Sequence, residues 1–205
     1  MNHLLTGLAM ILVLAGNGCV ASAASAEGVR PSSMQAVLSL LAAEEHVASA
    51  GELARIGPEG PDLVFRIAQD REQDIAYRAR ATSYLGYYQG NPKVEPFLSS
   101  LVTTPEPLLR RGLLSLARVS KGKAVPTISP HLKSQDTLVR EAAAQALAET
   151  DDVAALDVLR QAASQEREPY LRQKMYEIAE IAAERSSQLQ PHPEKNTQPS
   201  GLSTR

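Results

Sequence analysis

Residues 136–159 read DTLVREAAAQALAETDDVAALDVL. The stretch predicts a helix, a short turn and a second helix, because each half carries an apolar stripe at helical spacing. Versions of this pattern recur along the chain. We therefore expect a helical hairpin to be the unit from which the fold is built.

An arginine marks the first helix of each hairpin. Four of them follow at intervals of 32, 30 and 32 residues, namely Arg78, Arg110, Arg140 and Arg172. An apolar or aromatic residue precedes each arginine, and others stand three, six and seven positions after it. These offsets share one face of a helix, so four separate segments agree on one buried stripe. A hairpin of about 30 residues repeated in this way predicts an all-α solenoid.

Shorter apolar stretches follow the marked helices and predict the second helix of each hairpin, at residues 92–102, 124–132 and 153–163. Pro96, Pro126 and Pro130 predict that these second helices are kinked or very short. Upstream, residues 61–68 predict another second helix. The hairpin to which it belongs is degenerate, since His46 takes the place of the marker arginine.

The two ends of the solenoid are predicted to differ from its middle. Ahead of the degenerate hairpin, Ser32 or Ser33 is placed to cap the start of an additional apolar helix. Residues 170–185 predict a lone first helix that closes the core, and the polar residues 186–205 predict a disordered tail. We expect the solenoid to span residues 27–185.

The composition supports this fold class and excludes one class of partner. The 205 residues are 43% hydrophobic but only 4% aromatic, with no Trp, which suits close-packed helices better than sheets. The formal net charge of −2 argues against a dedicated nucleic-acid binder, which normally carries a strongly basic domain.

The N-terminus predicts export. A short apolar run is followed by Ala-x-Ala sites that end at Ala23 and Ala26, the layout of a cleaved signal peptide over residues 1–26. The alternative is lipid attachment at Cys19, the only cysteine, which would anchor the protein to a membrane. The expected location is periplasmic or secreted in the first case and membrane-anchored in the second.

The pattern Asp136-x-x-Val139-Arg140-x-x-Ala143-x-x-Ala146-Leu147 resembles the HEAT repeat in its short bacterial form, often called PBS-lyase-like. The resemblance implies a right-handed α-solenoid of stacked hairpins that serves as a protein-binding scaffold. It also implies that Asp136 and the marker arginines tie adjacent units together. Where other residues replace the aspartate, we expect apolar packing to hold the joints.

The marker arginines allow two interpretations. Arg78, Arg110, Arg140 and Arg172 recur at one register, which predicts an inter-repeat structural role. The alternative is a ladder that binds anions.

Charge is segregated between the units. Residues 104–134 hold six basic residues and one acidic residue, whereas residues 27–72 and 135–185 are net acidic. Arg118, Lys121 and Lys123 cluster at the turn of this basic third unit. They predict either a site for an anionic surface, lipid or acidic protein, or solvated turn residues neutralised by acidic neighbours.

Tyrosines gather in the second unit. Tyr77 and Tyr84 fall on the buried stripe, but Tyr87 and Tyr88 lie beyond it, beside a turn. Exposed tyrosines suit protein recognition, and the alternative is that the pair folds back over the edge of the repeat.

Nothing in the sequence predicts catalysis, a metal site or a cofactor. The histidines and carboxylates show no spacing typical of a zinc site or a catalytic triad, and no Gly-rich phosphate loop occurs. We expect a non-catalytic scaffold for an unidentified protein partner, with lipid or anion binding by the third unit as the alternative. The oligomeric state stays open.

Overall fold

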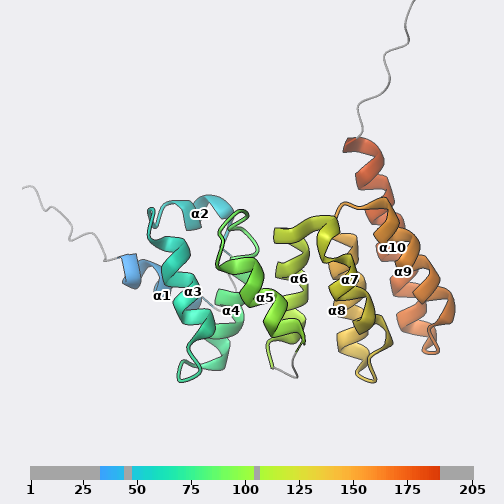
Figure 1. The fold of residues 1–205 in the computed structure, drawn as a ribbon, viewed down its shortest axis with the longest axis horizontal. Helices are drawn as coiled ribbons and strands as arrows, with labels where there is room; N and C mark the ends of the chain where they lie inside the picture. Colours follow the sequence, from blue (N-terminus) through green and yellow to red (C-terminus); the bar gives the residue numbers. More distant parts are fainter. Residues whose placement is uncertain (1–32, 44–47, 104–106, 190–205) are drawn as a thin grey trace, which may run out of the picture. The chain divides into compact units, whose positions relative to one another are not determined.

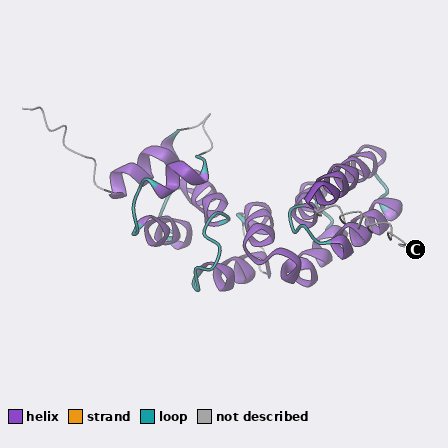
Figure 2. Cartoon of the chain, turned by 90° about the horizontal axis from the view of Figure 1, so that it is seen from above, coloured by secondary structure: helices purple, strands orange, loops and turns teal. Residues whose placement is uncertain are grey.

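The computed structural model describes residues 33–43, 48–103 and 107–189. Every regular element in these ranges is a helix, and the predicted all-α fold is confirmed (Figure 2). The elements are α1 (Ser33–Ala42), α2 (Ala50–Ala54), α3 (Gly60–Gln69), α4 (Ile75–Leu85), α5 (Val94–Thr103), α6 (Leu109–Ser120), η1 (Lys121–Ala124), α7 (Val125–Ile128), η2 (Ser129–Lys133), α8 (Thr137–Ala148), α9 (Val153–Gln165) and α10 (Pro169–Leu189).

The helices form two layers of an α-solenoid. The first helices of successive hairpins, α4, α6, α8 and α10, pack against one another in chain order (Figure 1). In the second layer, α3, α5 and α9 each pack against the first helix of the following hairpin. We call α4–α5 the second hairpin, α6 to η2 the third, and α8–α9 the fourth.

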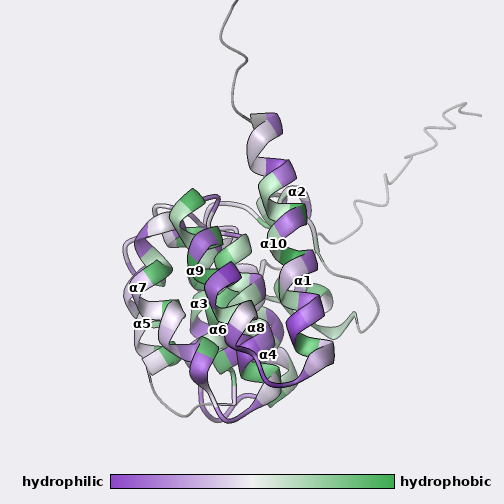
Figure 3. Cartoon of the chain, turned by 90° about the vertical axis from the view of Figure 1, so that its right-hand side faces the viewer, coloured by the Kyte–Doolittle hydropathy of each residue, from purple (hydrophilic) through white to green (hydrophobic). Residues whose placement is uncertain are grey.

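The predicted apolar stripe forms the core. All residues three, six and seven positions after the marker arginines are buried except Ile178, which is partly buried. In α10 the buried residues include Leu171, Met175 and Ala179, while Tyr170 and Ile181 lie on the exposed side. Figure 3 shows this alternation of hydrophobic and hydrophilic residues along α10.

Prolines shape the second helix of the third hairpin. Residues 121–133 form η1, α7 and η2 in place of one continuous helix, and α7 has only four residues. Pro126 and Pro130 each stand near the start of an element, and the elements are short, as predicted for these two prolines. The prediction for Pro96 was wrong, because α5 runs through it to Thr103. Pro96 lies in the first turn, where the missing N–H has no partner within the helix.

Aspartates cap three of the helices. The side chain of Asp74 accepts a hydrogen bond from the Ala76 amide, that of Asp136 from Leu138, and that of Asp152 from Ala154. Such caps contribute about 1 kcal/mol each. By contrast, Leu108 precedes α6 and offers no side-chain cap.

The C-terminal end of the solenoid differs from the prediction. Helix α10 continues to Leu189, so residues 186–189 are helical and the predicted start of the disordered tail was wrong. The Ser186 hydroxyl donates to the Ala182 carbonyl, 2.9 Å away, within this extra turn. The predicted signal peptide (1–26) and Cys19 lie outside the described residues. Among the described helices, none combines the length and apolar character needed to cross a bilayer.

Candidate functional site

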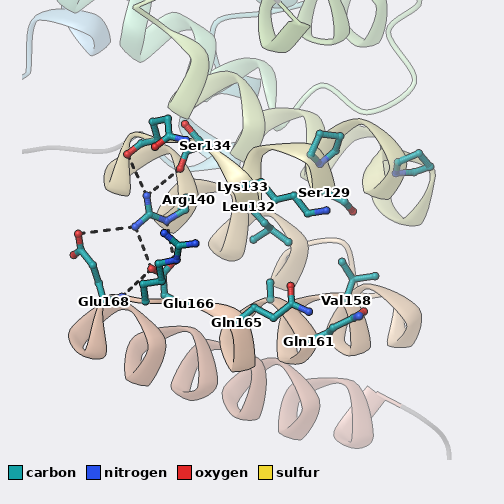
Figure 4. A pocket seen from close by; sticks show the side chains of 15 residues that line it. Ser129, Leu132, Lys133, Ser134, Arg140, Val158, Gln161, Gln165, Glu166 and Glu168 are labelled. Atoms are coloured by element: carbon teal, nitrogen blue, oxygen red, sulfur yellow. Dashed lines mark hydrogen bonds and ion pairs between the residues drawn. The ribbon is translucent and has the colours of Figure 1, made fainter.

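A groove of about 940 Å³ runs between the third and fourth hairpins. One wall is the proline-broken segment of α7 and η2, and the other is the exposed face of α9. Figure 4 shows Leu132 from the first wall opposite Gln161 and Gln165 from the second, with Arg140 at one end. We call this the α9 groove.

Local sequence explains why the groove is there. Pro126 and Pro130 interrupt the second helix of the third hairpin, whose last part, η2, packs against α8. Helix α9 in turn packs against α8 and α10. The residues that α9 contributes to the groove are spaced as one helical face, namely Val158, Gln161, Ala162 and Gln165.

Neutral amide groups dominate the α9 wall. Gln161 and Gln165 are exposed, and neither side chain makes a hydrogen bond within the described ranges. Each amide carries two donors and a carbonyl acceptor. The wall therefore offers unused hydrogen-bonding groups to a ligand.

A buried ion pair closes one end of the groove. Arg140 Nε lies 2.8 Å from Glu166 Oε2, and Arg140 Nη2 lies 3.1 Å from Glu166 Oε1. The two side chains are only 13% and 6% exposed. This hydrogen bonding lowers the pKa of the Glu166 carboxyl, against the opposing effect of burial. Both groups are therefore charged and mutually satisfied at neutral pH.

The same arginine reaches back to the preceding loop. Its Nη1 donates to the carbonyls of Ser134 and Gln135, 2.9 and 3.2 Å away. Arg140 thereby joins the loop before α8 to the loop after α9. This tie between hairpins uses Glu166, a partner that the repeat pattern did not single out.

The other predicted structural residues behave differently from one another. Arg78 donates to the Ala68 carbonyl at 3.4 Å, and Arg172 donates to the Glu166 carbonyl at 3.3 Å. Arg110 is exposed, and its side chain makes no hydrogen bond or ion pair within the described residues, so its inter-repeat role stays a prediction. Asp136 accepts a hydrogen bond from the Leu138 amide and so caps its own helix, and the inter-repeat role implied by the resemblance stays a prediction for it too.

Acidic residues of the fourth hairpin neutralise most of the basic cluster. Arg118 Nε lies 3.3 Å from Glu149 Oε2, and Lys121 Nζ lies 2.8 Å from Asp151 Oδ2. Arg185 of α10 joins the same two carboxylates. The interpretation as neutralised turn residues therefore holds for Arg118 and Lys121. Lys123 alone of the three is exposed without a side-chain partner in the described ranges.

The two tyrosines at the turn, Tyr87 and Tyr88, differ in burial. Tyr88 packs against the core, and burial raises the pKa of its phenol to about 12. Its hydroxyl has no hydrogen-bond partner among the described residues. Of the two interpretations, folding back over the repeat edge therefore describes Tyr88. Tyr87 is 39% exposed, and its role in recognition stays a prediction.

The described residues contain no grouping of His, Cys, Asp and Glu side chains that could hold a metal ion. Comparison with protein families gives one finding: residues 112–178 match the model for HEAT repeats. This part of the chain is similar to HEAT repeats. It extends from α6 into α10 and contains the whole α9 groove. A search of curated proteins finds no match.

Proposed function

We propose that this protein is a non-catalytic scaffold that binds an extended segment of a partner protein in the α9 groove. HEAT repeats commonly serve as protein-interaction scaffolds, and the matched residues include this groove. The observation that carries the proposal is the row of unused amides, Gln161 and Gln165, along one wall.

The amide spacing fits a peptide backbone. Residues four apart on a helix are neighbours, with Cβ atoms about 5–6 Å apart. An extended chain repeats its orientation every second residue, about 6.6 Å. The two glutamines can therefore address successive equivalent peptide groups, each amide donating to a carbonyl and accepting from an N–H. The volume also suits a ligand, since binding clefts commonly measure about 300–1,000 Å³.

The test uses peptides selected from a random 15-residue display library on the purified wild-type protein. Replacing both glutamines (Q161A/Q165A) should weaken the selected peptides by about tenfold, because two hydrogen bonds contribute about 0.5–1.5 kcal/mol each. The matched control is Q69A/Q188A, which removes two exposed amides, one from α3 and one from α10, that make no side-chain hydrogen bond within the described residues. Equal affinity for both double variants, or no enrichment from the library, would refute the proposal.

We also propose that the protein acts outside the cytoplasm. The support is the signal-like layout of residues 1–26. The mass of the mature chain distinguishes the two forms of export: a start at Ala24 or Glu27 means cleavage and release, whereas a lipid-modified start at Cys19 means anchoring. A mature chain that keeps Met1 would contradict both.

The alternative function, lipid or anion binding at the turn of the third hairpin, has less support. Arg118 and Lys121 are already paired with carboxylates. Lys123 is a single charge, which gives weak attraction to an anionic surface, about 1 kcal/mol.

A further inference from the structure

Two exposed arginines stand at the start of α6. Arg110 and Arg111 are exposed, and neither side chain makes a hydrogen bond or ion pair within residues 33–43, 48–103 and 107–189. They lie at the opposite end of α6 from Arg118, which is paired. Unpaired positive charge of the third hairpin therefore lies here as well as at Lys123, the one unpaired basic residue of the turn cluster within the described ranges.

Both arginines line a groove of about 390 Å³ between α4, α6 and α8. We call it the first-helix groove. Its apolar lining comes from all three helices and includes Ala79, Leu114, Leu138 and Ala142. Leu138 is 51% exposed, which leaves an apolar side chain uncovered beside two cations.

Helix geometry keeps the charged and apolar groups together. At 100° per residue, Arg110, Leu114 and Arg111 share one face of α6. Gly112 lies on the roughly opposite face of α6. That face packs against α5, since a Cβ on Gly112 would lie 2.5 Å from Leu101 Cδ2. Packing against α5 therefore fixes this face toward solvent.

The carboxylate in the groove does not neutralise the arginines. Glu141 accepts from Lys174 Nζ at 2.6 Å and from Gln145 Nε2 at 3.2 Å. The first turn of α6 also lacks an acidic residue and a side-chain cap. Positive charge at the amino end of a helix is unfavourable, so an anionic ligand here would remove repulsion as well as add hydrogen bonds.

We propose that the first-helix groove binds an acidic, amphipathic segment of a partner protein. Carboxylates of that segment pair with Arg110 and Arg111, because the planar guanidinium matches a carboxylate with two parallel hydrogen bonds. An apolar side chain of the segment covers Leu138 and Leu114. This surface uses different helices from the α9 groove, and the proposal does not depend on that site.

The charges favour a protein over a lipid surface. Each basic residue near an anionic membrane contributes only about 1 kcal/mol, and stable attachment needs several such signals. Here the two cations lie beside the fourth hairpin and α10, and residues 135–185 are net acidic with eleven acidic and six basic residues. These acidic residues repel an extended anionic surface but leave a narrow segment room to reach the arginines.

The probe is a synthetic helical peptide with Glu and Leu along one face and Ala and Gln elsewhere, measured by fluorescence anisotropy on the purified protein. We expect binding that weakens when the Glu residues become Gln or the Leu residues become Ala. The variant R110E/R111E should lose at least about tenfold in affinity, and L138A about threefold. The control K123E/K133E makes the same charge change at two exposed lysines and should change affinity by less than about twofold.

Circular dichroism verifies that each variant folds, and R110Q/R111Q provides a neutral second variant should the reversal disturb α6. Equal loss in R110E/R111E and K123E/K133E would overturn the proposal, since general charge would then explain binding. Absence of peptide binding would also overturn it. If the protein bound phosphatidylserine vesicles through the two arginines but bound no peptide, the ligand would be a lipid surface and the proposal would be overturned as well.

Discussion

Lys121 and Asp151 occupy equivalent turn positions in the third and fourth hairpins, and their side chains form an ion pair of 2.8 Å. Both have positive φ angles, 51° and 55°, whereas Gly57 and Gly90 take the positive φ in the earlier turns. The turn between the two helices thus requires a conformation that favours glycine. In the later hairpins, charged residues accept that conformation and link neighbouring turns.

The strain at Lys121 leads to the first prediction. Its φ of 51° and ψ of −138° lie in a region used almost only by glycine, at a cost of about 1–3 kcal/mol. The exposed ion pair with Asp151 contributes about 0.2–1 kcal/mol. Lys121→Gly should therefore raise the free energy of unfolding by about 1 kcal/mol in urea titrations. Lys121→Ala loses the ion pair and keeps the strain, so it should be destabilising; equal stability of the two variants would disprove the strain.

The second prediction concerns the tie between Arg140 and Glu166. Arg140→Met would leave a largely buried carboxylate unpaired and should lower the free energy of unfolding by about 3 kcal/mol. Adding Glu166→Gln should restore part of that loss, because the second change removes the uncompensated charge. Urea unfolding of both single variants and the double variant gives the coupling between them. Additive losses would mean that the pair contributes little to stability.

The third prediction is a dependence of stability on pH. Burial lowers the pKa of His131, and a backbone hydrogen bond with Val102 partly opposes this. The unfolded chain then binds a proton at higher pH than the folded protein does. The contribution of His131 to the free energy of unfolding is therefore complete above about pH 6.5 and is lost as the pH falls through the pKa of the folded state. We expect lower stability at about pH 5.5 than at about pH 7.5, and a smaller difference in His131→Gln. The pKa of Glu166 is lowered from 4.5, which places its titration below this window. If the difference in stability between the two pH values is the same in His131→Gln as in the wild type, a group other than His131 causes it.

The fold was predictable because its signal is local and repeated. One face of a helix recurs at Arg78, Arg110, Arg140 and Arg172, and the residues on that face are the core. The break in the third hairpin was also predictable, since Pro126 and Pro130 act on the backbone of their own segment.

The site was less predictable because its contacts cross from one hairpin to the next. Counting charges by unit placed Arg118 and Lys121 apart from Glu149 and Asp151, yet these groups pair across about 30 residues. The same count could not show that Arg110 differs from the other three marker arginines, because the difference lies in the groups to which each guanidinium can donate a hydrogen bond. The sequence left two interpretations open for Tyr88, because a residue beyond the stripe can be exposed or can turn its long side chain back onto the core, as it does here.

The fourth prediction tests how closely α5 and α6 pack. A Cβ on Gly112 would lie 2.5 Å from Leu101 Cδ2 and 3.0 Å from Val102 Cγ1. Gly112→Ala should lower the free energy of unfolding, because overpacking costs about 1–3 kcal/mol and outweighs the helix propensity gained, about 1 kcal/mol. Gly51→Ala is the control, since its nearest neighbour, Ser49 Oγ, would be 3.9 Å away, and it should be neutral or stabilising.

A double variant locates the cause of that destabilisation. Leu101→Ala removes the closest atom, so adding Gly112→Ala to it should cost less than the same change costs in the wild type. Thermal unfolding followed by circular dichroism gives the stability of the wild type, both single variants and the double variant. If the cost of Gly112→Ala is the same in both backgrounds, Leu101 does not limit the approach of the two helices, and the fixed orientation of Arg110 and Arg111 loses its physical basis.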